Sequence, residues 1–285
     1  MIFSDAHLHT NPVGGMGARE VARRLRKAGG WFMAIAPLLP HHYNLQPNLD
    51  GIKKAMDITI RECEAAREEG VECVCLVGVH PAVVDQVLRA CGDPARAYEI
   101  CSEALRYAAE KVREGRAVGI GEVGRQHYPV DPVNVVVSEM LMEEALAAAS
   151  DLDAIVHLHL ERGGAVTARD VAARADRAGM RRERVIIHHA DARVAREAAK
   201  LGLRFTVVGR AELLGSLGLP SKAILVESDF LDDPRRPGAV MYPWSIPEEV
   251  EELLGRGVLS EDDIATMFID NVCDVYGVVF RGCIR

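Results

Sequence analysis

DAIVHLHLERGGAVTARDVAARADRAGMRRERVIIHHA, residues 153–190, sets two short apolar runs (153–160 and 184–190) on either side of a helical pattern. Between the runs, residues 167–178 carry apolar side chains at spacings of three and four, which is typical of an amphipathic helix. Two strands joined through a helix pair in parallel, because the helix carries the chain back to the start of the next strand. The stretch therefore predicts one strand–helix–strand unit.

The same unit recurs along the chain. Further helical periodicity is present at 95–113, 134–149 and 260–276. We therefore expect an α/β fold, a TIM-type (β/α)8 barrel of parallel strands with outer helices, which usually takes about 250 residues as one domain. No linker divides the chain, so we expect a single domain over residues 1–285. The eight expected strands are MIF, WFMAIAP, ECVCLVGV, AVGIGEVG, DAIVHLHL, RVIIHHA, LRFTVV and KAILVESD.

The charge balance bears on possible partners. The chain has 34 basic and 42 acidic residues, a net charge of −8, so it has no overall basic surface for coating nucleic acid. Its cysteines are odd in number, seven, and the N-terminus lacks the pattern of a signal peptide. No apolar run reaches the roughly 18 residues needed to cross a bilayer. We expect a cytoplasmic protein outside the membrane, and the oligomeric state stays open.

All ten histidines lie before residue 190, and most of them end an expected strand. In a parallel barrel the carboxyl ends of the strands meet at one mouth, where active sites form. We expect His127 to be peripheral, while His41 and His42 can belong to either group. The histidines at strand ends are His7, His9, His80, His157, His159, His188 and His189.

Histidines and carboxylates, two kinds of metal ligand, occur together at these strand ends. His7 and His9 are two residues apart on an extended segment, so both imidazoles project to one side and can share a divalent cation. Glu122 ends the fourth strand between glycines, which allow close approach of backbone and ligand. By the same alternation, Glu227 and Asp229 point to one side at the end of the eighth strand, with Asp229 nearer the mouth.

These motifs occur in an order that resembles the TatD-related hydrolases of the amidohydrolase superfamily. The resemblance runs from residue 5 to residue 277, where the closing NVCDVYG also matches. The motifs are Asp5-x-His7-x-His9, Gly78-x-His80-Pro81, Gly121-Glu122-x-Gly124, one histidine on strand five, one on strand six, and Glu227-Ser228-Asp229. The chain departs from the pattern at 36–43, in the long loop 230–247, and at the strand-five histidine, where arginine commonly follows two residues later.

The resemblance implies a metal centre of one or two divalent ions (Zn, Mg or Mn). By position, His7, His9 and Asp229 hold the first ion, and Glu122 bridges to a second. His157, with His159 as its rival, and His189, with His188 as its rival, complete the second site. His157 matches the pattern without a gap, and His189 lies nearer the mouth, whereas alternation sends His188 and His189 to opposite sides.

The resemblance also implies hydrolysis by a metal-activated water, with Asp229 as the catalytic residue that orients the water or takes its proton. His80 and Arg125 are the expected substrate-binding residues, and Arg162, Arg235 and Arg236 are further candidates for an anionic substrate. The expected activity is that of a phosphodiesterase or deoxyribonuclease on a small-molecule or nucleic-acid substrate. The alternatives are a lactone, amide or ester hydrolase of the same superfamily and a non-catalytic metal-binding barrel.

Overall fold

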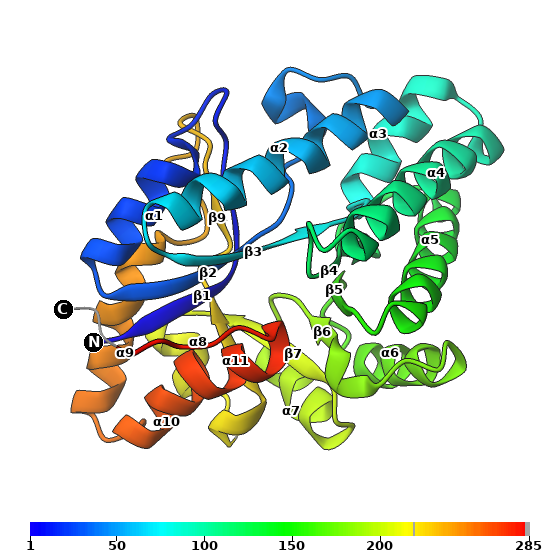
Figure 1. The fold of residues 1–285 in the computed structure, drawn as a ribbon. Helices are drawn as coiled ribbons and strands as arrows, with labels where there is room; N and C mark the ends of the chain where they lie inside the picture. Colours follow the sequence, from blue (N-terminus) through cyan, green and yellow to red (C-terminus); the bar gives the residue numbers. More distant parts are fainter. Residues whose placement is uncertain (219, 283–285) are drawn as a thin grey trace.

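The computed structural model describes residues 1–218 and 220–282 and contains one curled sheet surrounded by helices (Figure 1). Nine strands in this part of the chain pair in parallel in the order β8-β7-β6-β5-β4-β3-β2-β1-β9, which confirms the predicted barrel of TIM type. The strands are β1 Phe3–His9, β2 Gly30–Ile35, β3 Glu72–Val77, β4 Gly119–Gly124, β5 Ile155–His159, β6 Val185–Ile187, β7 Arg204–Val208, β8 Ile224–Glu227 and β9 Phe230–Leu231.

The sheet closes on itself where the chain passes from β8 to β9. The backbone N–H of Asp229 donates to the carbonyl of His7 at 3.0 Å, and β9 pairs in parallel with the last residues of β1. Asp229 has a φ of 49°, in the left-handed region, so the chain turns sharply between the two strands. The closure brings the ends of the first and last strands together at one rim.

Helices surround the sheet, and those predicted at 95–113, 134–149 and 167–178 are present with slightly different ends. The predicted helix 260–276 begins after Ser260, which forms a capping box with Asp263, but a π-helical turn, Thr266–Asp270, interrupts it. There the Trp31 indole N–H donates to the Phe268 carbonyl at 2.9 Å. The helices are α1 Gly17–Lys27, α2 Leu49–Glu68, α3 Pro81–Cys91, α4 Pro94–Arg113, α5 Pro132–Asp151, α6 Ala165–Arg177, α7 Ala192–Lys200, α8 Ala211–Gly215, α9 Ile246–Gly255, α10 Glu261–Ala265 and α11 Asn271–Tyr276.

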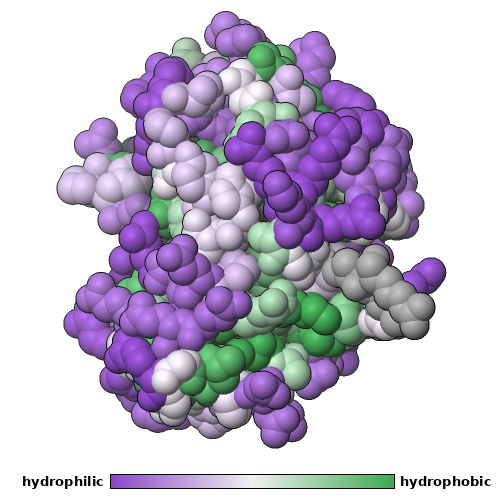
Figure 2. Space-filling view, turned by 90° about the vertical axis from the view of Figure 1, so that its left-hand side faces the viewer, coloured by the Kyte–Doolittle hydropathy of each residue, from purple (hydrophilic) through white to green (hydrophobic). Residues whose placement is uncertain are grey.

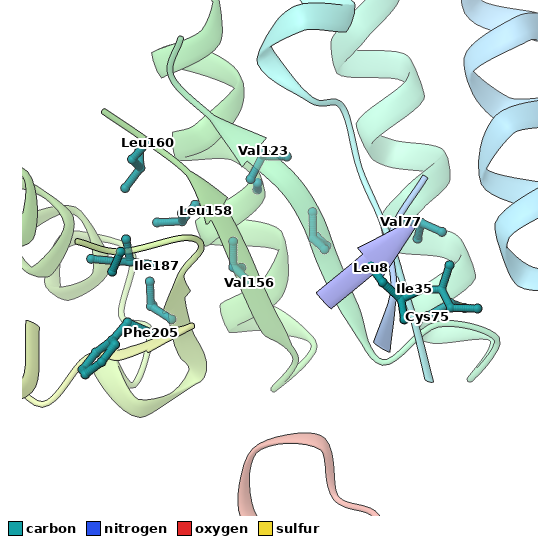
Figure 3. Packing of buried hydrophobic residues seen from close by; sticks show 14 of the residues in the cluster. Leu8, Ile35, Cys75, Val77, Val123, Val156, Leu158, Leu160, Ile187 and Phe205 are labelled. Atoms are coloured by element: carbon teal, nitrogen blue, oxygen red, sulfur yellow. The ribbon is translucent and has the colours of Figure 1, made fainter. Parts of the chain in front are cut away.

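Alternation along β5 separates the hydrophobic layer from the barrel interior. Val156 and Leu158 belong to the apolar layer between strands and helices, which Figure 3 shows from close by. Ile155 belongs instead to a second cluster inside the barrel, which α11 covers from below with Val272, Val275 and Tyr276. Because side chains alternate along a strand, His157 and His159 share the interior side with Ile155. His157 is therefore the deeper of the two, and His159 lies at the rim.

The outside of the molecule is mostly polar. Figure 2 shows one face on which hydrophilic side chains predominate, with a band of hydrophobic side chains across its lower part. Among the described residues, none of the helices is both long and apolar enough to cross a lipid bilayer.

Candidate metal centre

The first half of the centre is formed by β1 and β4. The Nε2 atoms of His7 and His9 lie 3.2 Å apart, and they lie 3.4 and 3.5 Å from Oε2 of Glu122. Nδ1 of His9 donates to the carbonyl of Ala36 at 2.9 Å, so the lone pair of this imidazole is on Nε2, which faces the carboxylates. Oδ1 of Asp229 lies 3.8 Å from the same Nε2. Two imidazoles and two carboxylates thus converge on one point.

The other oxygen of Glu122 faces a second group of imidazoles. Its Oε1 lies 3.0 Å from Nδ1 of His159 and 3.6 Å from Nε2 of His188. Oε1 also lies 3.8 Å from Nε2 of His80. The Glu122 side chain is almost fully buried. Because its two oxygens face different groups of imidazoles, this one carboxylate joins both halves of the cluster.

The two histidines that follow β6 both reach the mouth, contrary to the expected alternation. The strand ends at Ile187, and His189 has a φ of 41°, so extended geometry stops before the pair. Glu227 holds both residues: Oε2 accepts from Nδ1 of His188 at 2.8 Å, and Oε1 accepts from the backbone N–H of His189 at 3.1 Å. This leaves Nε2 of His188 free to face Glu122, whereas the His189 ring turns toward the open end.

His157, the preferred strand-five ligand in the sequence interpretation, lies below the cluster. The Tyr276 hydroxyl donates to the carbonyl of Ala6 at 2.9 Å, and it accepts from Nε2 of His157 at 3.0 Å. The His157 ring stacks on that of His7, with centroids 5.6 Å apart. The structure therefore brings the rivals His159 and His188 to Glu122, while His157 and His189 lie to either side, one deeper and one nearer the mouth.

Gly121 allows β4 and β5 to approach each other beside the cluster. A Cβ at this position would lie 2.7 Å from Cβ of His157, closer than side-chain atoms pack, so any larger residue would displace β5. The glycines around Glu122 thus set the spacing of the strands that carry the carboxylate and the histidines.

The charges of the cluster are strongly coupled. Burial opposes ionisation of Glu122, but His7 and His188 outweigh it and hold the pKa of this carboxyl well below its usual value. Burial likewise lowers the pKa of His7, but the Glu122 carboxylate reverses the effect and raises it to about 9. Burial and the charge of His7 lower the pKa of His9 to about 4. Burial raises the pKa of Asp229 to about 7, against the opposing effect of His7.

The donor set fits divalent cations. A four-coordinate ion with bonds of 2.0–2.1 Å separates neighbouring ligand atoms by about 3.3 Å, and the pairs of nitrogen and oxygen atoms around Glu122 lie 3.0–3.8 Å apart. The carboxylates of Glu122, Glu227 and Asp229 surround the buried His7 ring and favour positive charge at this point, which raises the pKa of His7. In the part of the chain that the structure describes, four sets of three ligand atoms lie within 4.8 Å of one another, among them His7–His9–Glu122 and His7–His188–Asp229.

A cavity of about 420 Å³ opens over the cluster. It is lined by Glu122, Asp229 and the histidines at the rim, together with Arg162 and Arg236. Its apolar lining comes from the two segments that depart from the family pattern and from the end of β7. These apolar residues are Pro37, Leu38, Leu39, Val208, Leu231 and Val240.

His80 lies at this cavity as expected, and its tautomer is set by the backbone. Its Nδ1 accepts from the N–H of Ala82 at 2.9 Å, as the cap of α3. The proton of a neutral ring is therefore on Nε2, which lies 3.3 Å from Nδ1 of His159. His80 is thus suited to donate a hydrogen bond into the cavity rather than to ligate a cation.

Arg125 does not reach the cavity. It follows β4 immediately, on the outer side, and is buried with its guanidinium bound by Glu161 through two hydrogen bonds of 2.9 and 2.8 Å. Glu139 of α5 and Asp170 of α6 also contact it. The expected role of Arg125 in substrate binding is therefore replaced by a structural one, since its donors are already occupied.

Arg235 is also occupied, by an ion pair with Asp233. Of the four arginines proposed from sequence, Arg162 and Arg236 line the cavity. His127, expected to be peripheral, lines it too. The only sequence signal for His127 was its position five residues after Glu122, in the loop that follows β4.

Fold and site together define a (β/α)8 barrel whose mouth holds a buried histidine–carboxylate cluster of metal-binding composition. The family model described as TatD related DNase matches residues 4–277. The chain belongs to this family, as the order of its motifs predicted.

Individual proteins are similar to this chain. An uncharacterized protein of Methanocaldococcus jannaschii, MJ1127, is 28% identical over 276 residues, which cover 96% of this chain and 95% of that protein. The TatD homolog YJJV of Escherichia coli is 19% identical, with a TM-score of 0.67 over 97% of this chain and 98% of that one. A phosphotriesterase homology protein of Escherichia coli, solved with phosphate in its active site, is 14% identical, with a TM-score of 0.63 over 96% and 98% of the two chains. At these identities the two structures show a shared fold.

Proposed function

We propose that this protein is a metal-dependent phosphodiesterase in which Glu122 bridges two divalent cations. The observation that carries the proposal is the division of this carboxylate between two ligand sets. Oε2 faces the Nε2 atoms of His7 and His9, whereas Oε1 faces His159 and His188. A buried carboxylate shared in this way is a suitable bridge between two ions.

We assign the residues to the two ions from the distances, with Nε2 of His188 lying equally far, 3.6 Å, from Glu122 and from Asp229. His7, His9, Glu122 and Asp229 would hold the first ion. Glu122 with His159 and His188 would hold the second, so in our proposal these two histidines replace the preferred His157 and His189 of the sequence interpretation. Because imidazoles outnumber carboxylates in the combined set, zinc or a similar transition metal suits it better than magnesium.

When bound, such cations polarise a phosphoryl oxygen and lower the pKa of a coordinated water toward 7. Asp229 is the proposed general base. It lies at the mouth on the sharp turn after β8, beside Nε2 of His9 and Nε2 of His188, so its carboxylate is placed to accept a proton from a water at the centre. His80 would donate from Nε2 to the negative charge that develops on the substrate.

The substrate class is supported by the charge inside the cavity. Arg162 and Arg236 line it beside the proposed metal site, which suits an anionic ester. The family description names a DNase, and one structural neighbour holds phosphate in its active site. A cavity of about 420 Å³ and a net charge of −8 favour a small phosphodiester or a strand end over a long duplex.

A second candidate is hydrolysis of an apolar carboxylic ester or lactone. It is favoured by the apolar residues that line the same cavity, among them Leu38, Leu39 and Val240. Such a lining would hold an acyl chain by hydrophobic contact.

The test uses metal-free protein to which zinc, manganese or magnesium is added. We expect hydrolysis of bis(p-nitrophenyl) phosphate and of short single-stranded DNA that depends on added metal. Asp229→Asn should lower kcat by about 10²–10⁴-fold, the usual contribution of a general base. A panel of lactones and p-nitrophenyl esters run in parallel decides between the candidates. Hydrolysis of esters without hydrolysis of phosphodiesters would overturn the first proposal.

A further inference from the structure

Three histidines gather on the side of His159 that faces away from Glu122. His127 comes from the loop after β4, His159 from the end of β5, and His189 from the turn after β6. The ring centroids of His127 and His189 lie 4.7 and 4.6 Å from that of His159 and 5.4 Å from each other. We call these three residues the outer histidine group, since it lies beside the proposed metal ligands and not among them, except for His159.

The outer histidine group presents nitrogen atoms that have no protein partner. The His159 side chain is only 9% exposed, and its Nε2 atom is buried without a hydrogen-bond partner. Among the described residues, the rings of His127 and His189 also make no hydrogen bond to a protein group. A buried polar atom without a partner is costly unless something else satisfies it, so Nε2 of His159 is available to a ligand in the cavity.

The proposed metal site determines what this ligand is. With a cation on Nδ1 of His159, the proton of the neutral ring is on Nε2, which makes this atom a hydrogen-bond donor directed into the outer histidine group. A donor of this kind is satisfied by an acceptor oxygen.

The charges around the outer histidine group also favour a ligand with acceptor oxygens. Arg162 lines the same cavity as the outer histidine group, and the Glu122 carboxylate contacts the other nitrogen of His159, Nδ1, rather than Nε2. A guanidinium nearby disfavours a third cation and favours an anion, to which it can donate in a bidentate manner. Ligand spacing alone also permits a cation at the three histidines, so the experiment must distinguish the two.

We propose that His127, His159 and His189, together with Arg162, bind a second phosphate group of the substrate, next to the one that is hydrolysed. The inference rests on the proposed function, because the Nε2 proton of His159 follows from the cation on Nδ1. It narrows the substrate to phosphodiesters that carry a further phosphate, as at a phosphorylated strand end.

The test is equilibrium binding of thymidine 3′,5′-bisphosphate and thymidine 5′-monophosphate to zinc-loaded protein by calorimetry. We expect the bisphosphate to bind at least about tenfold more tightly, or about 1.4 kcal/mol. His127→Phe and Arg162→Gln should each reduce this ratio toward one. His41→Phe is the matched control, since His41 is also exposed but lies outside the cavity lining, and it should keep the wild-type ratio.

The readout does not require turnover, so it separates this inference from the proposed function. A bisphosphate preference that His127→Phe removes would support the second phosphate site even if no phosphodiester were hydrolysed. Equal affinity of the wild type for both nucleotides would overturn it. Zinc content should be the same in wild type and His127→Phe, and the loss of one zinc per chain in the variant would overturn the anion site in favour of a third cation.

Discussion

The pairs of histidines on β5 and after β6 reach the cluster by different geometry. His157 and His159 are two residues apart on a regular strand, so both enter the barrel and depth separates them. His188 and His189 are adjacent, and both reach the mouth because the strand has ended and His189 adopts a left-handed conformation. The comparison shows that two features decide which imidazole meets Glu122. One is the direction in which the side chain leaves the strand, and the other is the residue at which the strand ends.

The largest effect should come from substituting the histidines of the β5 pair, one at a time. His159→Asn should remove one of two bound cations and lower kcat/KM by more than about a hundredfold, since even outer-shell partners of a metal contribute 10–100-fold. His157→Asn, in the same strand and also buried, should keep both cations. Elemental analysis and phosphodiesterase kinetics on both variants make the comparison. Loss of a cation from His157→Asn with none from His159→Asn would contradict the β5 assignment.

An intermediate effect is expected at the residue that holds the β6 pair. Glu227→Gln weakens the hydrogen bond that orients His188, so zinc affinity should fall about 10–100-fold with the fold intact. Competition with a chromophoric chelator measures this affinity. Glu249→Gln is the control, because Glu249 also accepts a backbone N–H, from Ala211 on the outside of the barrel. Equal zinc affinity in the two variants would show that Glu227 does not orient a ligand.

The smallest effect is expected from removing the hydrogen-bond partner of His157, the deeper histidine of the β5 pair. Tyr276→Phe removes the hydroxyl between His157 and the Ala6 carbonyl. Because a buried acceptor and donor lose their partner, the free energy of unfolding should fall by roughly 1–3 kcal/mol. Urea denaturation of metal-free protein measures the loss. The number of bound cations should stay at the wild-type value, and a lower number would place His157 among the ligands.

The sequence predicted the parts of the molecule that depend on periodicity. Apolar runs predicted the eight barrel strands, but the first strand runs from Phe3 to His9 and so extends well beyond the predicted run MIF at residues 1–3. Strand ends brought His7, Glu122 and Asp229 to one rim. Such features follow from residue spacing alone, because the closed sheet fixes where each strand ends.

Other features depend on contacts that spacing does not contain. Nε2 of His157 is hydrogen-bonded to Tyr276, more than a hundred residues away in the chain, and spacing along β5 does not predict this partner. The direction of His189 follows from a left-handed turn, which the residue type does not predict. Arg125 is bound by carboxylates of α5, α6 and the loop between β5 and α6, so its burial appears only when these elements pack.

A crystal structure of the zinc-loaded protein, with anomalous scattering measured at the zinc edge, tests the two-cation centre most directly. We predict two peaks on opposite sides of the Glu122 carboxylate. One should lie about 2.0–2.2 Å from Nε2 of His7 and His9, and the other at that distance from Nδ1 of His159 and Nε2 of His188. A single peak that Glu122 does not contact, or a peak bound to His157, would contradict the proposed centre.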